Sequence, residues 1–290
     1  MLNMLASLDQ LNTLPGVLYC STFILGLLIG SFLNVVIYRL PKMMEQDWKE
    51  QCSALLDQEL PETDKMTLST PNSTCPKCQH AIKPWENIPV FSYLFLKGRC
   101  SQCKNKISAR YPIIEFVTAI LSVMIIYQFG ASYAGLCALG LTWVLVSLTM
   151  IDADTQLLPD SLTLPLLWSG LIINSFGVFT DLESALWGAV FGYLSLWSVY
   201  QLFKLLTGKE GMGFGDFKLL AALGAWIGWQ SLPIVILLSS VVGAVIGISM
   251  ILIKGKDKNV PIPFGPYLAI AGWITVVWGD QIRVIWLGNI

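Results

Sequence analysis

The chain has 290 residues, of which 54% are hydrophobic and only 13% are charged. Soluble domains carry about a quarter charged residues, so this composition excludes an ordinary soluble domain. Eleven tryptophans and 24 glycines are typical of membrane helices, which tolerate glycine and place tryptophan at the interfaces. The formal net charge of −1 is uninformative, but the distribution of the charges along the chain is not.

The first apolar segment, residues 16–38, is long enough to cross a bilayer, which takes about 20 residues. Residues 1–15 contain no lysine or arginine, and no small-residue cleavage site follows the apolar stretch. A secretory signal needs both features. We therefore expect the first segment to be a retained helix.

A polar block, residues 39–110, separates this segment from the other apolar stretches and holds eleven of the 18 basic residues. The sequence predicts an all-α polytopic membrane protein with about eight transmembrane helices. The expected divisions are 1–38 (N-terminal segment and first helix), 39–110 (cytoplasmic zinc-binding domain) and 111–290 (seven-helix membrane domain). The helices are expected near 16–38, 111–128, 132–150, 157–178, 184–203, 217–230, 233–253 and 263–279.

Basic residues segregate to one side of this eight-helix topology. Seventeen of the 18 fall in the 39–110 block or in the loops that share its side, and only Arg283 falls on the other. Lysine and arginine accumulate on the cytoplasmic side of membranes, so the 39–110 block is predicted to be cytoplasmic. The basic residues outside that block but on its side are Lys204, Lys209, Lys218, Lys254, Lys256 and Lys258.

Four cysteines form two C-x2-C pairs in the polar block: Cys75 with Cys78, and Cys100 with Cys103. Two such pairs complete a tetrahedral four-thiolate site, for which zinc is the usual metal. The cytoplasmic placement disfavours the competing disulfide interpretation. Because protein would fill all four positions, the zinc is predicted to be structural.

The remaining cysteines and the single histidine are not expected to bind the metal or to take part in catalysis. Cys20 and Cys137 lie in apolar segments and are expected to pack there. Cys52 stands alone in a charged segment, and His80 is expected to be a solvated loop residue beside the first cysteine pair. One histidine leaves no Ser-His-Asp or Cys-His triad unless His80 supplies the base.

Two short acidic motifs lie at the ends of predicted helices. Asp152, Asp154 and Asp160 occur between the third and fourth helices, and Asp216 follows three glycines before the sixth. Ionisable residues at membrane depth by default mark function. A pair of carboxyl groups can share one proton, so that one activates water while the other donates a proton. A purely structural interpretation of these acids stays open. Asp160 could be a helix N-cap, and Asp154 could be a solvated residue. A GxGD string also arises easily by chance.

The combined segments resemble the prepilin leader peptidase family, the bacterial type IV leader peptidases within the GxGD membrane aspartyl proteases. The blocks that carry the resemblance are Gly30–Pro41, the cysteine pairs with Glu86–Val90 between them, Ile107–Pro112 followed by Glu115, and the segments around Asp152 and Asp216.

The resemblance implies an activity that could not be inferred from composition. Members cleave the basic leader of type IV prepilins and type II secretion pseudopilins after a glycine at the cytoplasmic face of the bacterial inner membrane. Many then N-methylate the new terminal residue with S-adenosylmethionine. The resemblance implies catalytic roles for Asp152 and Asp216, and zinc ligation by the four paired cysteines. It places no methyl-donor site, and it implies the lipid bilayer but no nucleic acid as a partner.

Two alternatives remain open at this point. A transporter with a cytoplasmic zinc domain would use the aspartates as proton or ion relays, and it would show internal symmetry between its halves. A related peptidase would cleave the leader without methylating the product. Leader cleavage distinguishes the first alternative, and the mass of the mature pilin distinguishes the second.

Overall fold

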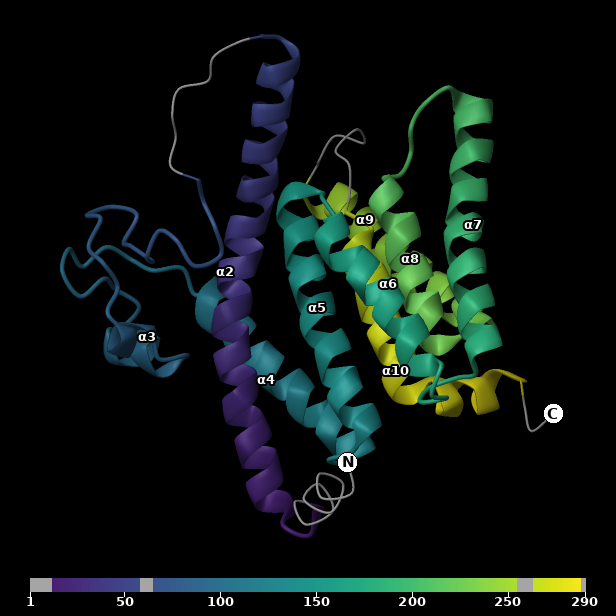
Figure 1. Cartoon of the computed structure of the whole chain (residues 1–290), viewed down its shortest axis with the longest axis horizontal. Coiled ribbons are helices and arrows are strands. Elements are labelled where there is room, and N and C mark those ends of the chain that lie inside the picture. The colour runs from purple at the N-terminus through teal and green to yellow at the C-terminus, as the bar shows by residue number, and fades with distance from the viewer. Residues whose placement is uncertain (1–11, 58–64, 255–262, 288–290) are drawn as a thin grey trace. The chain divides into compact units, whose positions relative to one another are not determined.

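The computed structural model describes residues 12–57, 65–254 and 263–287. Within these ranges every extended regular element is a helix (Figure 1), and the only β pairings are two isolated bridges. The all-helical prediction is therefore confirmed for the described residues. Lys256 and Lys258, which are predicted on the cytoplasmic side, lie outside them.

The chain divides into two compact units, Met1–Ser132 and Tyr133–Ile290. In the first unit, α2 (Pro15–Leu55) packs against α4 (Arg110–Phe129). Gly26 and Gly30 make this approach possible, since a Cβ atom would lie 2.5 Å from the Ala119 Cα and 2.6 Å from the Glu115 Cα, respectively. Between the two helices the chain forms the short helices η1 (Pro84–Asn87) and α3 (Phe91–Phe95).

The helix that was predicted to end at residue 38 instead continues to Leu55, with Pro41 inside it. The prediction followed hydropathy, which marks where a segment leaves the apolar layer but not where the helix stops. Residues 42–55 are polar yet helix-compatible, and Lys49 forms an ion pair with Glu45 one turn earlier, at 2.7 Å.

The described part of the second unit contains six α-helices and a 3₁₀ turn. In chain order they are α5 (Tyr133–Thr155), α6 (Asp160–Asn174), α7 (Leu182–Thr207), α8 (Phe214–Ile227), η2 (Trp229–Ser231), α9 (Leu232–Lys254) and α10 (Gly265–Leu287). Helix α8 is buried along nearly its whole length, where it packs against α6, α7 and α10 (Figure 1). It forms the core of this unit.

A buried asparagine holds the C-terminal end of α8. The Asn174 side chain donates hydrogen bonds to the carbonyl oxygens of Ala225 (2.8 Å) and Trp226 (3.0 Å). Its own oxygen accepts from the backbone N–H groups of Phe179 and Thr180. Carbonyl groups in the last turn of a helix have no partner within the helix, so Asn174 satisfies them where water is absent.

A helix lies at each of the eight predicted positions, but among the described residues only five helices meet the length and hydropathy expected of a membrane span. They begin at Pro15, Arg110, Tyr133, Leu182 and Trp229. Helices α6 and α8 have 15 and 14 residues, and the apolar part of α10 is also short. The chain is thus a membrane protein with at least several spanning helices, while the count of eight stays a prediction.

Close packing of α7 on α8 gives the first testable prediction. A Cβ atom on Gly224 would overlap the backbone of Gly188. Gly224→Ala should therefore lower the free energy of unfolding by about 1–3 kcal/mol. The matched control is Gly140→Ala, because nothing lies within 4 Å of a Cβ at that helical position. Thermal unfolding in detergent should show a lower midpoint for the first variant only; equal midpoints would contradict the packing.

Candidate functional site

Asp152 lies in the last turns of α5, inside the helix and not in the loop where the sequence had placed it. Its side chain is only 5% exposed. The Oδ2 atom accepts a hydrogen bond from the backbone N–H of Gly265, at 3.0 Å. Gly265 is the first residue of α10, and a helix N-terminus favours a negative charge because its first N–H groups have no partner within the helix.

Asp216 lies in the first turn of α8, where the sequence had predicted it just before the helix. It is 8% exposed, and its own N–H donates to the Gly213 carbonyl at 3.3 Å. Asp152 lies close enough to Asp216 for the two carboxyl groups to interact electrostatically. The fold of the second unit therefore brings together the two aspartates that the sequence had paired.

Leu158 fixes the backbone around the two aspartates. It lies in the α5–α6 loop and packs on two glycines at once. A Cβ on Gly215 would come 2.7 Å from the Leu158 Cβ, and one on Gly265 would come 3.2 Å from its Cδ1 and 2.7 Å from Asp152 Oδ2. The starts of α8 and α10 can approach the end of α5 only because these positions lack side chains.

The two neighbouring acids differ from this pair. Asp154 and Asp160 are both exposed. The Lys218 ammonium donates to both carboxylate oxygens of Asp160, at 2.7 and 2.8 Å. Asp160 was considered as an N-cap, but Pro159 occupies that position and Asp160 joins α6 to α8. Burial thus separates Asp152 and Asp216 from the other acids in the two motifs.

The four paired cysteines converge in the first unit. Their sulfur atoms all lie within 4.8 Å of one another, which is compatible with a single metal ion. Cys75 Sγ lies 3.7 Å from Cys103 Sγ, and Cys78 Sγ lies 3.9 Å from Cys100 Sγ. Among the described residues this is the only cluster of three or more potential metal ligands.

The two cysteine pairs have the same backbone geometry. The N–H of the first cysteine donates to the carbonyl five residues later, Cys75 to His80 and Cys100 to Asn105, each at 2.9 Å. Backbone N–H groups of Cys78 and Lys77 lower the pKa of the Cys75 thiol to about 6. The N–H groups of Cys103 and Gln102 lower the pKa of Cys100 in the same way. Burial and the neighbouring sulfur atoms instead raise the pKa of Cys78 to about 11. Thiolates are the metal-binding form, so the backbone favours ligation by the first cysteine of each pair.

His80 is not the solvated residue that the sequence predicted. It is half-buried, and its Nε2 lies 3.3 Å from Glu86 Oε2. Glu86 also accepts a hydrogen bond from the Lys83 N–H, at 3.0 Å, and this bond is the main cause of its lowered pKa. His80 is outside the metal-ligand cluster. Cys20, which was expected to pack, is instead exposed on α2.

Three polar residues in the resemblance blocks have structural contacts that the sequence did not reveal. Glu115, buried in α4, accepts a hydrogen bond from the Val90 N–H at 2.8 Å. Asn34 donates to the Tyr111 carbonyl at 3.1 Å. Arg39 is buried and donates to three carbonyl groups in the segment before the first cysteine pair, those of Thr67, Leu68 and Pro71. These contacts join the cysteine-containing segment to α2 and α4.

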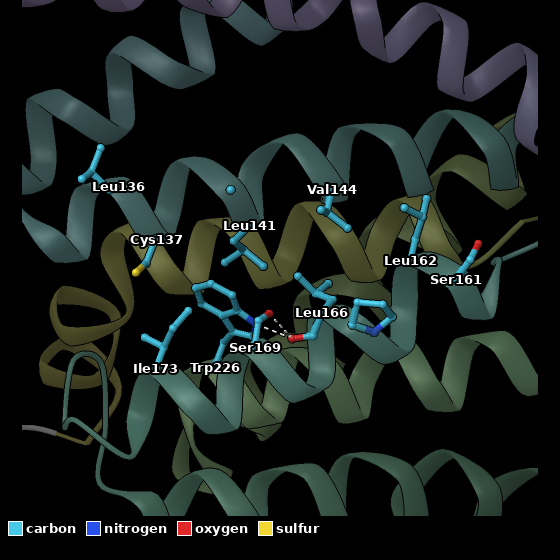
Figure 2. Close-up of a pocket in the computed structure, with 12 residues that line it drawn as sticks. Leu136, Cys137, Leu141, Val144, Ser161, Leu162, Leu166, Ser169, Ile173 and Trp226 are labelled. Carbon is cyan, nitrogen blue, oxygen red and sulfur yellow. Dashed lines mark hydrogen bonds between the residues drawn. The ribbon is translucent and has the colours of Figure 1, made fainter. Parts of the chain in front are cut away.

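A cavity lies elsewhere, between α5 and α6. Its volume is about 380 Å³, and Figure 2 shows Leu136 and Cys137 at one end and Ser161 at the other. Ser169 and the Trp226 indole both donate to the Leu166 carbonyl within it. The lining is mostly apolar and includes neither Asp152 nor Asp216, so this cavity is not the site of the carboxyl chemistry.

Two family models match the chain. The bacterial peptidase A24 N-terminal domain matches residues 24–129, and the type IV leader peptidase family matches residues 139–248. The two matches contain the cysteine cluster and the two aspartates, respectively. No solved structure matches the chain.

Several curated proteins are similar over nearly the whole chain, and each is named prepilin leader peptidase/N-methyltransferase. The protein from Pseudomonas aeruginosa is 58% identical over 97% of both chains. The protein from Aeromonas salmonicida is 54% identical over 98% of both. The protein from Neisseria gonorrhoeae is 51% identical over 89% of this chain and 90% of its own.

The cysteine geometry predicts that Cys75→Ser lowers the amount of metal bound per chain, because a hydroxyl does not replace a thiolate in a four-sulfur site. Elemental analysis of the purified protein measures this directly. Cys52→Ser and Cys137→Ser are matched controls, since both residues lie outside the cluster, and they should keep the wild-type content. Unchanged metal in the Cys75 variant would contradict the site.

Proposed function

The chain belongs to the type IV leader peptidase family, and from this membership we propose that it is a membrane aspartyl endopeptidase with Asp152 and Asp216 as its catalytic pair. The proposed substrates are type IV prepilins and type II secretion pseudopilins. The relatives' names support the first of these. A single observation supports the catalytic assignment. Both carboxyl groups are buried, and they lie close enough to interact electrostatically.

Two adjacent carboxyl groups cannot both ionise easily, so such a pair holds one proton between them. The ionised member takes a proton from water as its oxygen attacks the scissile peptide carbonyl. The protonated member donates to the carbonyl oxygen and later to the leaving amine. The Gly265 N–H donates to one oxygen of Asp152, and in this mechanism the other oxygen exchanges the proton with water.

The scissile bond is proposed to lie at the cytoplasmic face. Asp152 lies in the last turns of an apolar span and Asp216 in the first turn of a buried helix, so both lie near helix ends. The segregation of 17 of the 18 basic residues supports the placement of these ends, and of the 39–110 domain, in the cytoplasm. A prepilin would insert with its basic leader on that side and its apolar segment in the bilayer. Eight spans and divisions at 38 and 110 remain part of this proposal.

Zinc is the proposed metal of the four-cysteine cluster. Four thiolates with two lowered pKa values fit zinc in a closed tetrahedral site. Such a site leaves no position for water or substrate, so its role is structural. S-adenosylmethionine is the proposed methyl donor, because the relatives' names include N-methyltransferase. We assign no residues to its binding.

Replacement of either aspartate by asparagine should lower the rate of leader cleavage by about 10²–10⁴-fold or more. Asparagine preserves the shape of the side chain but cannot exchange a proton. Asp154→Asn is the matched control, because Asp154 lies on the same turn but is exposed. Purified variants in detergent with a prepilin substrate would be compared by gel shift. Near-wild-type cleavage by either Asp152→Asn or Asp216→Asn would contradict the assignment.

Methylation should not depend on the aspartate pair. Asp216→Asn should therefore methylate a mature pilin that has already been cleaved, with S-adenosylmethionine present. Mass spectrometry would detect one added methyl group at the pilin N-terminus. If the wild-type protein cleaves a prepilin but never methylates the product, the chain is a peptidase alone.

A further inference from the structure

The first unit exposes a cluster of large apolar side chains on η1 and α3. These are Trp85 (65% exposed), Ile88 (48%), Phe91 (56%), Leu94 (65%) and Phe95 (85%), and we call them the aromatic patch. Beside them lies a cavity of about 300 Å³ that is lined by Trp85, Ile88, Phe91, Phe95 and Leu96 together with the polar residues Glu86 and Ser92. A surface of this kind marks a binding site for a protein, a membrane or a ligand.

A hydrogen bond holds this patch beside the first turns of a candidate membrane helix. Val90, which directly precedes α3, donates its N–H to Glu115 Oε2 at 2.8 Å. Glu115 lies in the second turn of α4, one of the five apolar helices long enough to span a bilayer. At 1.5 Å per residue it is roughly 8 Å from the start of that helix. The beginning of α3 is therefore held next to the N-terminal turns of α4, a candidate membrane span.

Positive charge surrounds the patch. The segment from Ala81 to Ile107 contains five basic residues and one acidic residue, Glu86. The Lys83 ammonium lies 5.4 Å from the centre of the Trp85 ring. Lys97 and Arg99, which follow α3 directly, are exposed. Aromatic and apolar side chains beside lysine and arginine are the composition of elements that lie in the interface of a membrane containing anionic lipids.

We propose that the aromatic patch is a lipid-binding surface that inserts into the headgroup and upper acyl-chain region of an anionic bilayer. Lys83, Lys97 and Arg99 would contact the lipid phosphates while Phe91, Leu94 and Phe95 enter the apolar layer. The metal-binding segment would then be held to the membrane by lipid as well as by Glu115. This inference does not depend on the peptidase chemistry.

The test places an environment-sensitive NBD fluorophore on the patch in full-length protein. Cys20→Ser, Cys52→Ser and Cys137→Ser leave only the four metal-binding cysteines, and Phe95→Cys adds the labelling site. The matched control keeps the native Cys52, an exposed residue near the end of α2, and omits Phe95→Cys. A third protein carries all three Cys→Ser substitutions and no Phe95→Cys. Its metal content should match the wild type and it should take up no label, which confirms that the cluster is intact and unlabelled.

Both proteins would be reconstituted in nanodiscs that contain phosphatidylglycerol, with either brominated acyl chains or iodide in the buffer as quencher. We expect brominated lipid to quench the label at residue 95 and iodide to quench it several-fold less than the label at Cys52. Leu94→Cys should behave like Phe95→Cys. Quenching of residue 95 by iodide to the same extent as Cys52 would overturn the proposal. Protection from both quenchers would also overturn it, because protein would then cover the patch.

Discussion

The structure around the proposed catalytic site depends on the burial of two carboxyl groups near helix ends, one in α5 and one in α8. An ionised carboxylate that loses water without a partner costs several kcal/mol. The second unit offsets this cost with a backbone N–H from the start of α10, which donates to Asp152, and with the first turn of α8, which carries Asp216. Hydrogen bonds to a charged group contribute about 1.5–3 kcal/mol each.

This arrangement constrains the backbone more than the side chains. Three helix ends must meet around Leu158, and they meet at Gly215 and Gly265 because even one Cβ atom would collide. Further along the same helices, Gly188 and Gly224 let α7 and α8 touch, and Asn174 satisfies the carbonyl groups where α8 ends. Close packing behind the site holds the two acids in position, which the proposed reaction requires.

Part of this organisation could be predicted from the sequence, because the spacing of certain residue types indicates which side chains act together. The C-x2-C pairs identified a cluster that the fold does assemble, and hydropathy located eight helices. The Gly265 donor was missed because a backbone N–H leaves no signature in the sequence; only the Gly-Pro step at the start of α10 hints at it. Glu115 could have been noticed as an acid within an apolar segment. The continuation of α2 to Leu55 could not be predicted from hydropathy, because the helix continues beyond the end of its apolar segment.

The central claim is that Asp152 and Asp216 share one proton and act together. The pH dependence of kcat/KM for leader cleavage tests it most directly, with metal content measured at each pH so that loss of the cluster is not mistaken for titration. The account predicts a bell-shaped profile, since one acid must be ionised and the other protonated, and Asp160→Asn should keep both limbs. A profile with a single limb, at constant metal content, would contradict a shared proton.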